Sequence, residues 1–239
     1  MTTRPTVRVG SIVAALLLAA TAATTRPAAA APRSLLLAGS QWSAGGNSSY
    51  AGWIHALRGD RLGRGWFLRP WLSYTTYRYR RGDTTIHARA PGASLGVGYA
   101  WSDAAGARSL SLAPGYQDTR LRPDDPANDA RGGRALLLVQ GQWRQRLAGR
   151  WSLRVIANDA LGPGNYWGRL RAARRLPGGL SVGPSVVRQG GPGYRAWQGG
   201  VFVRWPVVRR WHVELEGGYQ KYAGLAGEGY AGLSVDLAY

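Results

Sequence analysis

Apolar side chains recur at every second position through most of the chain after residue 31. In the final segment the apolar residues are Ala231, Leu233, Val235, Leu237 and Tyr239, and those between them are small or polar. A period of two is typical of β-strands with one apolar and one polar face. The chain is therefore predicted to be all-β.

Segments with this alternation predict about twelve antiparallel strands. The expected strands are 34–42, 48–57, 65–79, 90–102, 107–118, 133–146, 150–160, 165–176, 180–190, 194–206, 210–221 and 228–239. The first two alternate poorly, so ten or fourteen strands stay open as alternatives. An even number of strands with ~9–11 spanning residues each is typical of an up-and-down transmembrane β-barrel.

Aromatic residues separate a barrel from a soluble β-sandwich, which would also alternate. On the apolar phase, Trp and Tyr favour strand ends, as at Trp101, Trp151 and Trp211. A sandwich would spread aromatics through its inward face, whereas a membrane barrel gathers them into interfacial girdles. The terminal Tyr239 also resembles the C-terminal signal of outer-membrane proteins. We expect residues 32–239 to form an outer-membrane barrel.

The connections predict which end of the barrel carries the larger loops. Most links after even-numbered strands are tight, whereas those after odd-numbered strands include the long segments 80–89 and 119–132. Short periplasmic turns and long outer loops would produce this asymmetry.

The first 31 residues have the pattern of a secretory signal peptide. Arg4 and Arg8 precede an apolar stretch from Ser11 to Ala23, and small residues follow up to Ala31. A short membrane anchor is the alternative, but the apolar stretch is shorter than the ~20 residues of a spanning helix. We expect the protein to be exported to the outer membrane.

Composition narrows the function classes. The chain has 31 Lys and Arg against 12 Asp and Glu, and it has no Cys. Without Cys, disulfide frameworks and thiolate metal sites are excluded. The basic residues are scattered, and all but Lys221 are arginine, so we expect no nucleic-acid partner.

Many arginines fall on the polar phase, which would line the barrel lumen, and they outnumber Glu214, Glu216 and Asp159. A net positive lumen would favour anions or hydroxyl-rich chains, bound by guanidinium groups and stacked aromatics. Alternatively, Arg–Glu and Arg–Tyr pairs close the lumen. The candidate lumen-lining contact residues are Arg69, Trp71, Arg154, Trp167, Arg169, Arg171, Arg204, His212, Glu214 and Glu216.

Catalytic and metal-binding chemistry have little support. His55, His87 and His212 are not at ligand spacing, and we expect no metal and no cofactor. His212 and Glu214 on one strand face would suit a hydrolase with a lumen Ser as nucleophile, but no nucleophile elbow is present. We expect these groups to pair with arginines.

An acidic, proline-containing segment runs from Pro123 to Asp129. Its carboxylates suit a cation such as Ca²⁺, but Asp, Asn and Pro are also the usual turn residues. We favour the turn.

Several short segments together resemble the bacterial cellulose biosynthesis protein BcsS family. They are Tyr50-Ala51-Gly52, Gly65-Trp66, Leu68-Arg69, Tyr77-Arg78-Tyr79, Asp125-Pro126-Ala127-Asn128, Tyr166-Trp167-Gly168-Arg169, Gly183-Pro184 and the glycine-rich 190–193. In that family an acidic residue often follows the Gly-Pro pair, whereas this chain has Ser185. The resemblance implies an envelope protein of an exopolysaccharide system.

From these observations we expect a non-enzymatic outer-membrane barrel associated with cellulose or exopolysaccharide biosynthesis and secretion, as a passage, docking partner or envelope scaffold. Its expected partners are outer-membrane lipid, a polysaccharide and the cellulose synthase or secretion apparatus. The alternative is an outer-membrane hydrolase that acts on lipid or glycan.

Overall fold

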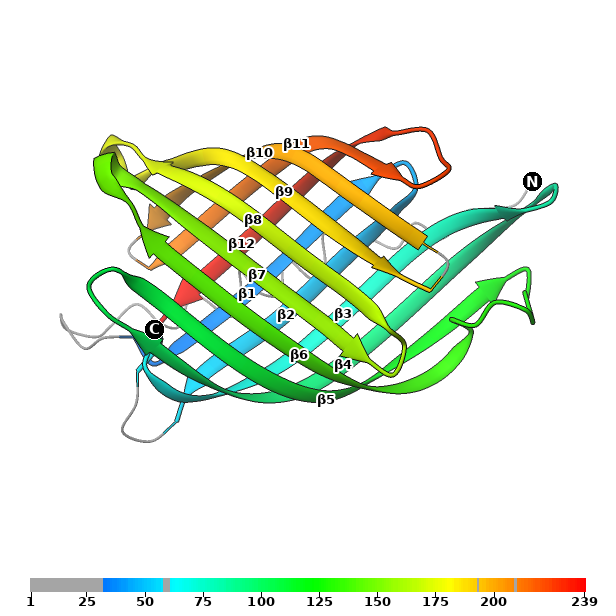
Figure 1. Cartoon of the computed structure of the whole chain (residues 1–239), viewed down its shortest axis with the longest axis horizontal. Helices are drawn as coiled ribbons and strands as arrows, with labels where there is room; N and C mark the ends of the chain where they lie inside the picture. Colours follow the sequence, from blue (N-terminus) through cyan, green and yellow to red (C-terminus); the bar gives the residue numbers. More distant parts are fainter. Residues whose placement is uncertain (1–31, 58–60, 193, 209) are drawn as a thin grey trace. The chain divides into compact units, whose positions relative to one another are not determined.

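The computed structural model describes residues 32–57, 61–192, 194–208 and 210–239. The predicted signal peptide, residues 1–31, lies outside the described residues. The described part forms a closed antiparallel barrel of twelve strands in which each strand pairs with its neighbours in sequence (Figure 1). The strands are β1 Ser34–Ser43, β2 Gly46–Ala56, β3 Gly65–Arg81, β4 Thr84–Ser102, β5 Gly106–Arg122, β6 Gly132–Arg146, β7 Trp151–Leu161, β8 Asn165–Arg175, β9 Ser181–Gly191, β10 Tyr194–Val208, β11 Trp211–Tyr222 and β12 Glu228–Ala238, with single 3-10 turns at Ala148–Arg150 and Pro177–Gly179.

Pairing of β1 with β12 closes the barrel. Ala38 lies opposite Val235 in this pair, and the backbone N–H of Ser34 donates to the carbonyl oxygen of Tyr239 over 2.8 Å. Closure leaves no unpaired sheet edge, which is the condition for strands to cross a bilayer. The predicted all-β barrel and its twelve strands are confirmed. We call the end that holds residues 32 and 239 the terminal end, and the opposite end the distal end.

The strand register sorts side chains into an outward and an inward phase. Outward side chains include the exposed Leu95, Leu112 and Val201, whereas the inward ones include the buried Arg171 and Gln198. This is the reverse of a soluble domain, because the apolar face lies outside. No helix within the described ranges is long and apolar enough to cross a membrane.

Outward aromatic side chains form two belts, as predicted from the strand ends. The belt near the terminal end includes Trp66, Tyr99, Trp101, Trp143, Trp151, Trp205 and Trp211, and the belt toward the distal end includes Trp42, Tyr74, Tyr116, Tyr166, Trp197 and Tyr219. In the first belt, Tyr99 packs at 5.3 Å from Trp66 and 6.2 Å from Trp101 between ring centroids. Trp and Tyr prefer the two bilayer interfaces, so the belts mark the edges of an apolar band.

The predicted contrast between short and long links is wrong. Segment 80–89 is not a loop, because β3 continues to Arg81 and β4 begins at Thr84. Segment 119–132 shrinks to residues 123–131, because β5 continues to Arg122. The difference between the two ends lies in the strands instead: β3 and β5 have 17 residues and β4 has 19, whereas β1 has 10.

The distal parts of these long strands carry a small core on their inward side. Ile86, Ala88 and Leu121 are buried there, with Tyr77 and Tyr79 packed against them. Loop 123–131 lies next to this core at the distal end (Figure 1).

Asp125 holds loop 123–131 in place. It is 4% exposed, it accepts a hydrogen bond from the Tyr79 hydroxyl over 2.8 Å, and it pairs with Arg81. Asn128 donates to the same Tyr79 hydroxyl over 2.6 Å. The acidic segment is therefore a turn fixed to β3, which is the role that the sequence favoured over cation binding.

Candidate functional site in the barrel lumen

All ten candidate residues lie on the inward phase of their strands. Register pairs show this directly, because paired residues share a face: Arg154 lies opposite Arg171, and Arg204 lies opposite Glu214. The candidates come from β3, β7, β8, β10 and β11, so the lumen brings together residues that are far apart in sequence.

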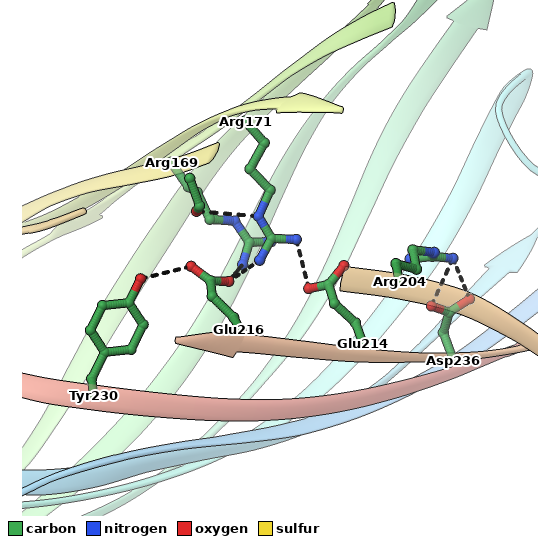
Figure 2. A network of polar contacts seen from close by, with 8 residues as sticks. Arg169, Arg171, Arg204, Glu214, Glu216, Tyr230 and Asp236 are labelled. Atoms are coloured by element: carbon green, nitrogen blue, oxygen red, sulfur yellow. Dashed lines mark hydrogen bonds and ion pairs between the residues drawn. The ribbon is translucent and has the colours of Figure 1, made fainter. Parts of the chain in front are cut away.

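Arg171 on β8 is the centre of a buried ionic network (Figure 2). Its Nη1 donates to Glu214 Oε1 over 2.6 Å, its Nη2 donates to Glu216 Oε2, and its Nε lies 3.3 Å from Ser185 Oγ. Two strands, β9 and β10, lie between β8 and β11, which carries the two glutamates, so the contacts reach across the inner surface and do not follow the sheet.

The network continues from Glu216 in two directions. The Tyr230 hydroxyl donates to Glu216 Oε1 over 3.0 Å, and Arg169 Nη1 lies 3.9 Å from Glu216 Oε2. Each oxygen of the Glu216 carboxylate therefore has a partner. Charged and polar groups buried in this way stabilise a structure only when every member is satisfied.

A second ion pair lies nearer the terminal end. Arg204 Nη2 lies 2.9 Å from the Asp236 carboxylate, and His212 Nδ1 lies 3.3 Å from Asp236 Oδ2. Asp236 therefore pairs with Arg204, whereas the buried His212 Nδ1 lies near the same carboxylate without making a hydrogen bond.

Aromatic rings and guanidinium groups stack on the lumen wall. The guanidinium carbon of Arg69 lies 4.6 Å from the Trp71 ring centroid, and Tyr50 stacks on Trp71 at 5.0 Å with an interplanar angle of 9°. Gly39 faces the Tyr50 ring, where an added Cβ would lie 2.7 Å from the hydroxyl, and Gly52 faces the Trp71 ring. These glycines let the rings lie flat. On the other side of the lumen, Arg169 lies 5.4 Å from the Trp167 ring centroid.

The lumen charges are segregated by strand. In the described strands, the inward carboxylates are Glu214, Glu216, Glu228 and Asp236, all on β11 and β12, whereas the inward arginines are Arg69, Arg81, Arg134, Arg144, Arg146, Arg154, Arg169, Arg171, Arg175 and Arg204. The inward residues of β4 and β5 carry no charge and are mostly Ala, Gly, Ser and Thr. An arginine-rich face thus meets an acidic face beside a neutral wall of small residues.

Asp159 does not belong to this lumen set, contrary to the prediction. It pairs with Val139 and Tyr166 on the outward phase at the distal end of β7, where it is exposed. Glu228 and Asp236 take its place in the lumen, where the inward arginines still outnumber the carboxylates.

Tyr50, Tyr230 and Asp236 take part in these lumen contacts, but the sequence analysis did not name them as candidates. Tyr50 could not be assigned to a face from the sequence, because strands 1 and 2 alternate poorly. Asp236 was noted only as one of the polar residues between the apolar positions of the last strand. Tyr230 had a usable signal, because it is an aromatic residue on a phase otherwise made of small and polar side chains.

The candidate catalytic carboxylates are engaged in ion pairs. Glu214 and Glu216 contact Arg171, and His212 contacts Asp236. Ser234, across from Glu214 in the register, is hydrogen-bonded to Tyr50. Within the described residues, no group of three or more His, Asp and Glu side chains is placed to hold a metal ion.

The fold and this lumen together define a β-barrel of the outer-membrane type with an arginine-rich interior. A family model for the cellulose biosynthesis protein BcsS matches residues 35–239. The chain belongs to this family, as its short segments indicated. No curated protein matches the chain in sequence.

Solved outer-membrane barrels share the fold. An outer-membrane channel from Pseudomonas putida F1 (COG4313) aligns with a TM-score of 0.57 and 11% identity over 90% of this chain and all (100%) of the other. The KdgM porin aligns with a TM-score of 0.53 and 9% identity over 86% and 99%. The translocator domain of the autotransporter NalP from Neisseria meningitidis aligns with 0.56 and 9% over 96% of both chains. At these identities the likeness concerns the fold alone.

Proposed function

We propose that this protein is a non-enzymatic outer-membrane barrel that serves cellulose secretion by offering a hydroxyl-rich chain a path along its lumen. Membership of the cellulose biosynthesis family supports a role in that process. The barrel fold with its two aromatic belts supports a location in the outer membrane. The single observation that carries the proposal is the pairing of inward arginines with aromatic rings at Trp71 and Trp167.

The chemistry of these pairs suits a polysaccharide. A guanidinium group offers five N–H donors and stays charged, so it binds hydroxyl and other oxygen acceptors at any ordinary pH. A flat Trp face offers an apolar surface on which a sugar ring can lie. The two stacks lie on β3 and β8, on either side of the acidic strands β11 and β12, so a chain in the lumen would contact both.

A hydrolase is the less favoured function. General acid and base groups need freedom to exchange a proton with a substrate, whereas Glu214 and Glu216 are each bound to Arg171. His212 Nδ1 lies 3.3 Å from Asp236 Oδ2 without a hydrogen bond, and the serine nearest in the register, Ser234, has Tyr50 as its partner. These engagements favour an ionic network with a structural role.

Complementation of a gene deletion tests the proposal. The deletion is expected to lower extracellular cellulose, and wild-type protein is expected to restore it. Arg69→Gln with Trp71→Leu, and Arg169→Gln with Trp167→Leu, are expected to restore it only in part, whereas His212→Ala and Glu214→Gln are expected to restore it in full. The matched control is Arg188→Gln, since Arg188 is an exposed arginine on the outward phase of β9.

Normal cellulose output in the deletion strain would overturn the proposal. Loss of output in His212→Ala and Glu214→Gln, with both stack variants active, would favour the hydrolase instead. Heat-modifiable migration on a gel would show that every variant forms a folded barrel.

A further inference from the structure

The hydrophobic phase of β3, β4 and β5 inverts along their length. In their terminal parts the outward residues are apolar, including Leu72, Leu95 and Leu112. Beyond Tyr74 and Tyr116 the outward residues become polar and mostly basic, while the inward ones include the apolar and buried Ile86 and Leu121. Such an inversion is expected where a barrel leaves the bilayer, because its outer face then meets headgroups and water.

Just beyond the inversion lies a dense set of outward basic side chains, which we call the distal arginine cluster. It consists of Arg78, Arg80, His87, Arg89, Arg120 and Arg122. All six are exposed.

The strand register stacks these side chains directly beside one another. Arg78, His87 and Arg122 form one row across three strands, and Arg89 lies opposite Arg120. Side chains opposite each other in a sheet have Cβ atoms about 5 Å apart, and like charges there, as at Arg89 and Arg120, are destabilising. Asp118 is the single acid on the outward phase of these three strands, and it pairs with Arg120 over 2.8 Å. The cluster is therefore a concentration of positive charge that folding alone does not require.

We propose that the distal arginine cluster binds the phosphate groups of an anionic glycolipid in the outer leaflet of the membrane, a conclusion that rests on the proposed outer-membrane setting. Arginine binds phosphate through two parallel hydrogen bonds, and several arginines together suit a headgroup with more than one phosphate. The longer distal ends of β3, β4 and β5 support an orientation with the distal end on the outer side.

The height of the cluster and its surroundings fit a lipid better than a soluble anion. Arg78 follows Tyr74, and Arg120 follows Tyr116, by four positions on the same strand, which is about 13 Å along the strand and roughly 10 Å above the aromatic belt after allowing for tilt. The exposed leucines of the apolar band lie directly below on the same strands. A bound lipid would place its phosphates on the cluster and its acyl chains on these leucines.

Native mass spectrometry of the purified full barrel in detergent tests the proposal, with bisphosphorylated lipid A and the same lipid without phosphates as probes. The test variant is Arg78→Gln, Arg89→Gln, Arg122→Gln. The matched control is Arg108→Gln, Arg150→Gln, Arg174→Gln, which removes three exposed arginines near the terminal end. The wild type is expected to retain the phosphorylated lipid at least about tenfold more strongly than the dephosphorylated one. The test variant is expected to lose about a hundredfold in affinity for the phosphorylated lipid, with the control within about twofold of the wild type.

Equal retention of both lipids, or equal losses in the test and control variants, would overturn the proposal. Displacement of the lipid by millimolar inorganic phosphate would also overturn it, in favour of a soluble-anion site. The same variants assayed for cellulose output separate this inference from the proposed function, since the cluster lies outside the lumen. If the wild-type protein shows no preference for the phosphorylated lipid but supports normal cellulose output, the lipid site is contradicted and the proposed function is not.

Discussion

Arg171 connects the two charged faces of the lumen. Arg171 is 5% exposed, and its guanidinium group contacts both Glu214 and Glu216, with the Tyr230 hydroxyl bound to Glu216. Removing one member of a buried ion pair usually costs more than the pair itself contributes, because the remaining charge is left without a partner. Arg171 is accordingly the lumen side chain whose loss should matter most for stability.

We expect Arg171→Met to lower the free energy of unfolding by about 3–5 kcal/mol, because Glu214 would lose its ion-pair partner and Glu216 would keep only Tyr230 and the more distant Arg169. The triple variant Arg171→Met, Glu214→Gln, Glu216→Gln should regain most of this loss. Urea unfolding in detergent micelles, followed by tryptophan fluorescence, measures the free energy of unfolding of the single and the triple variant. Arg175→Met, at the exposed end of the same strand, is the control. A single variant as stable as the wild type would show that the network contributes nothing to the fold.

Among the elements, the hairpins β3–β4 and β5–β6 differ most from expectation, and the reason is physical. The sequence analysis assumed that each strand has one apolar face along its whole length. In β4, however, the apolar Ile86 and Ala88 lie on the inward face, which is small or polar nearer the terminal end. Alternation reports the solvent on each side of a strand, so a strand that crosses from lipid into water changes phase and resembles a loop.

Loop 123–131 depends on Asp125 for its position, so Asp125→Ala should release it. The variant loses the bond from Tyr79 and the pair with Arg81. We expect trypsin to cleave after Arg131 about tenfold faster than in the wild type, since these charge-assisted bonds oppose local opening. Asp129→Ala, an exposed acid in the same loop, should leave the rate unchanged. Equal cleavage rates for the two variants would refute this role of Asp125.

For the whole molecule, alternation and aromatic strand ends were enough to predict a closed barrel and its number of strands. They also assigned Arg169 and Arg171 to the inward phase, because phase is a local property of a strand. They did not predict that Arg171 meets Glu216, which lies 45 positions further along the chain. That contact depends on barrel curvature and strand tilt, which no local spacing encodes.

The charge balance of the lumen also emerges only from the whole barrel. Among the described residues, inward acids are confined to β11 and β12, and Asp159 faces outward. Arg154 lies in the field of Arg169, Arg171 and Arg204, with Gln142 Oε1 3.4 Å from its Nη2. The excess of arginine is therefore concentrated where β7, β8 and β10 face the lumen.

The central claim is that the barrel spans a membrane and offers a positively charged path through its lumen. The reversal potential of the purified protein in a planar bilayer under a salt gradient tests it most directly. The wild type is expected to be anion-selective, and Arg154→Glu with Arg169→Glu should move the reversal potential toward cation selectivity, whereas the outward Arg188→Glu should not. A cation-selective wild type, or a folded barrel that carries no current, would contradict the claim.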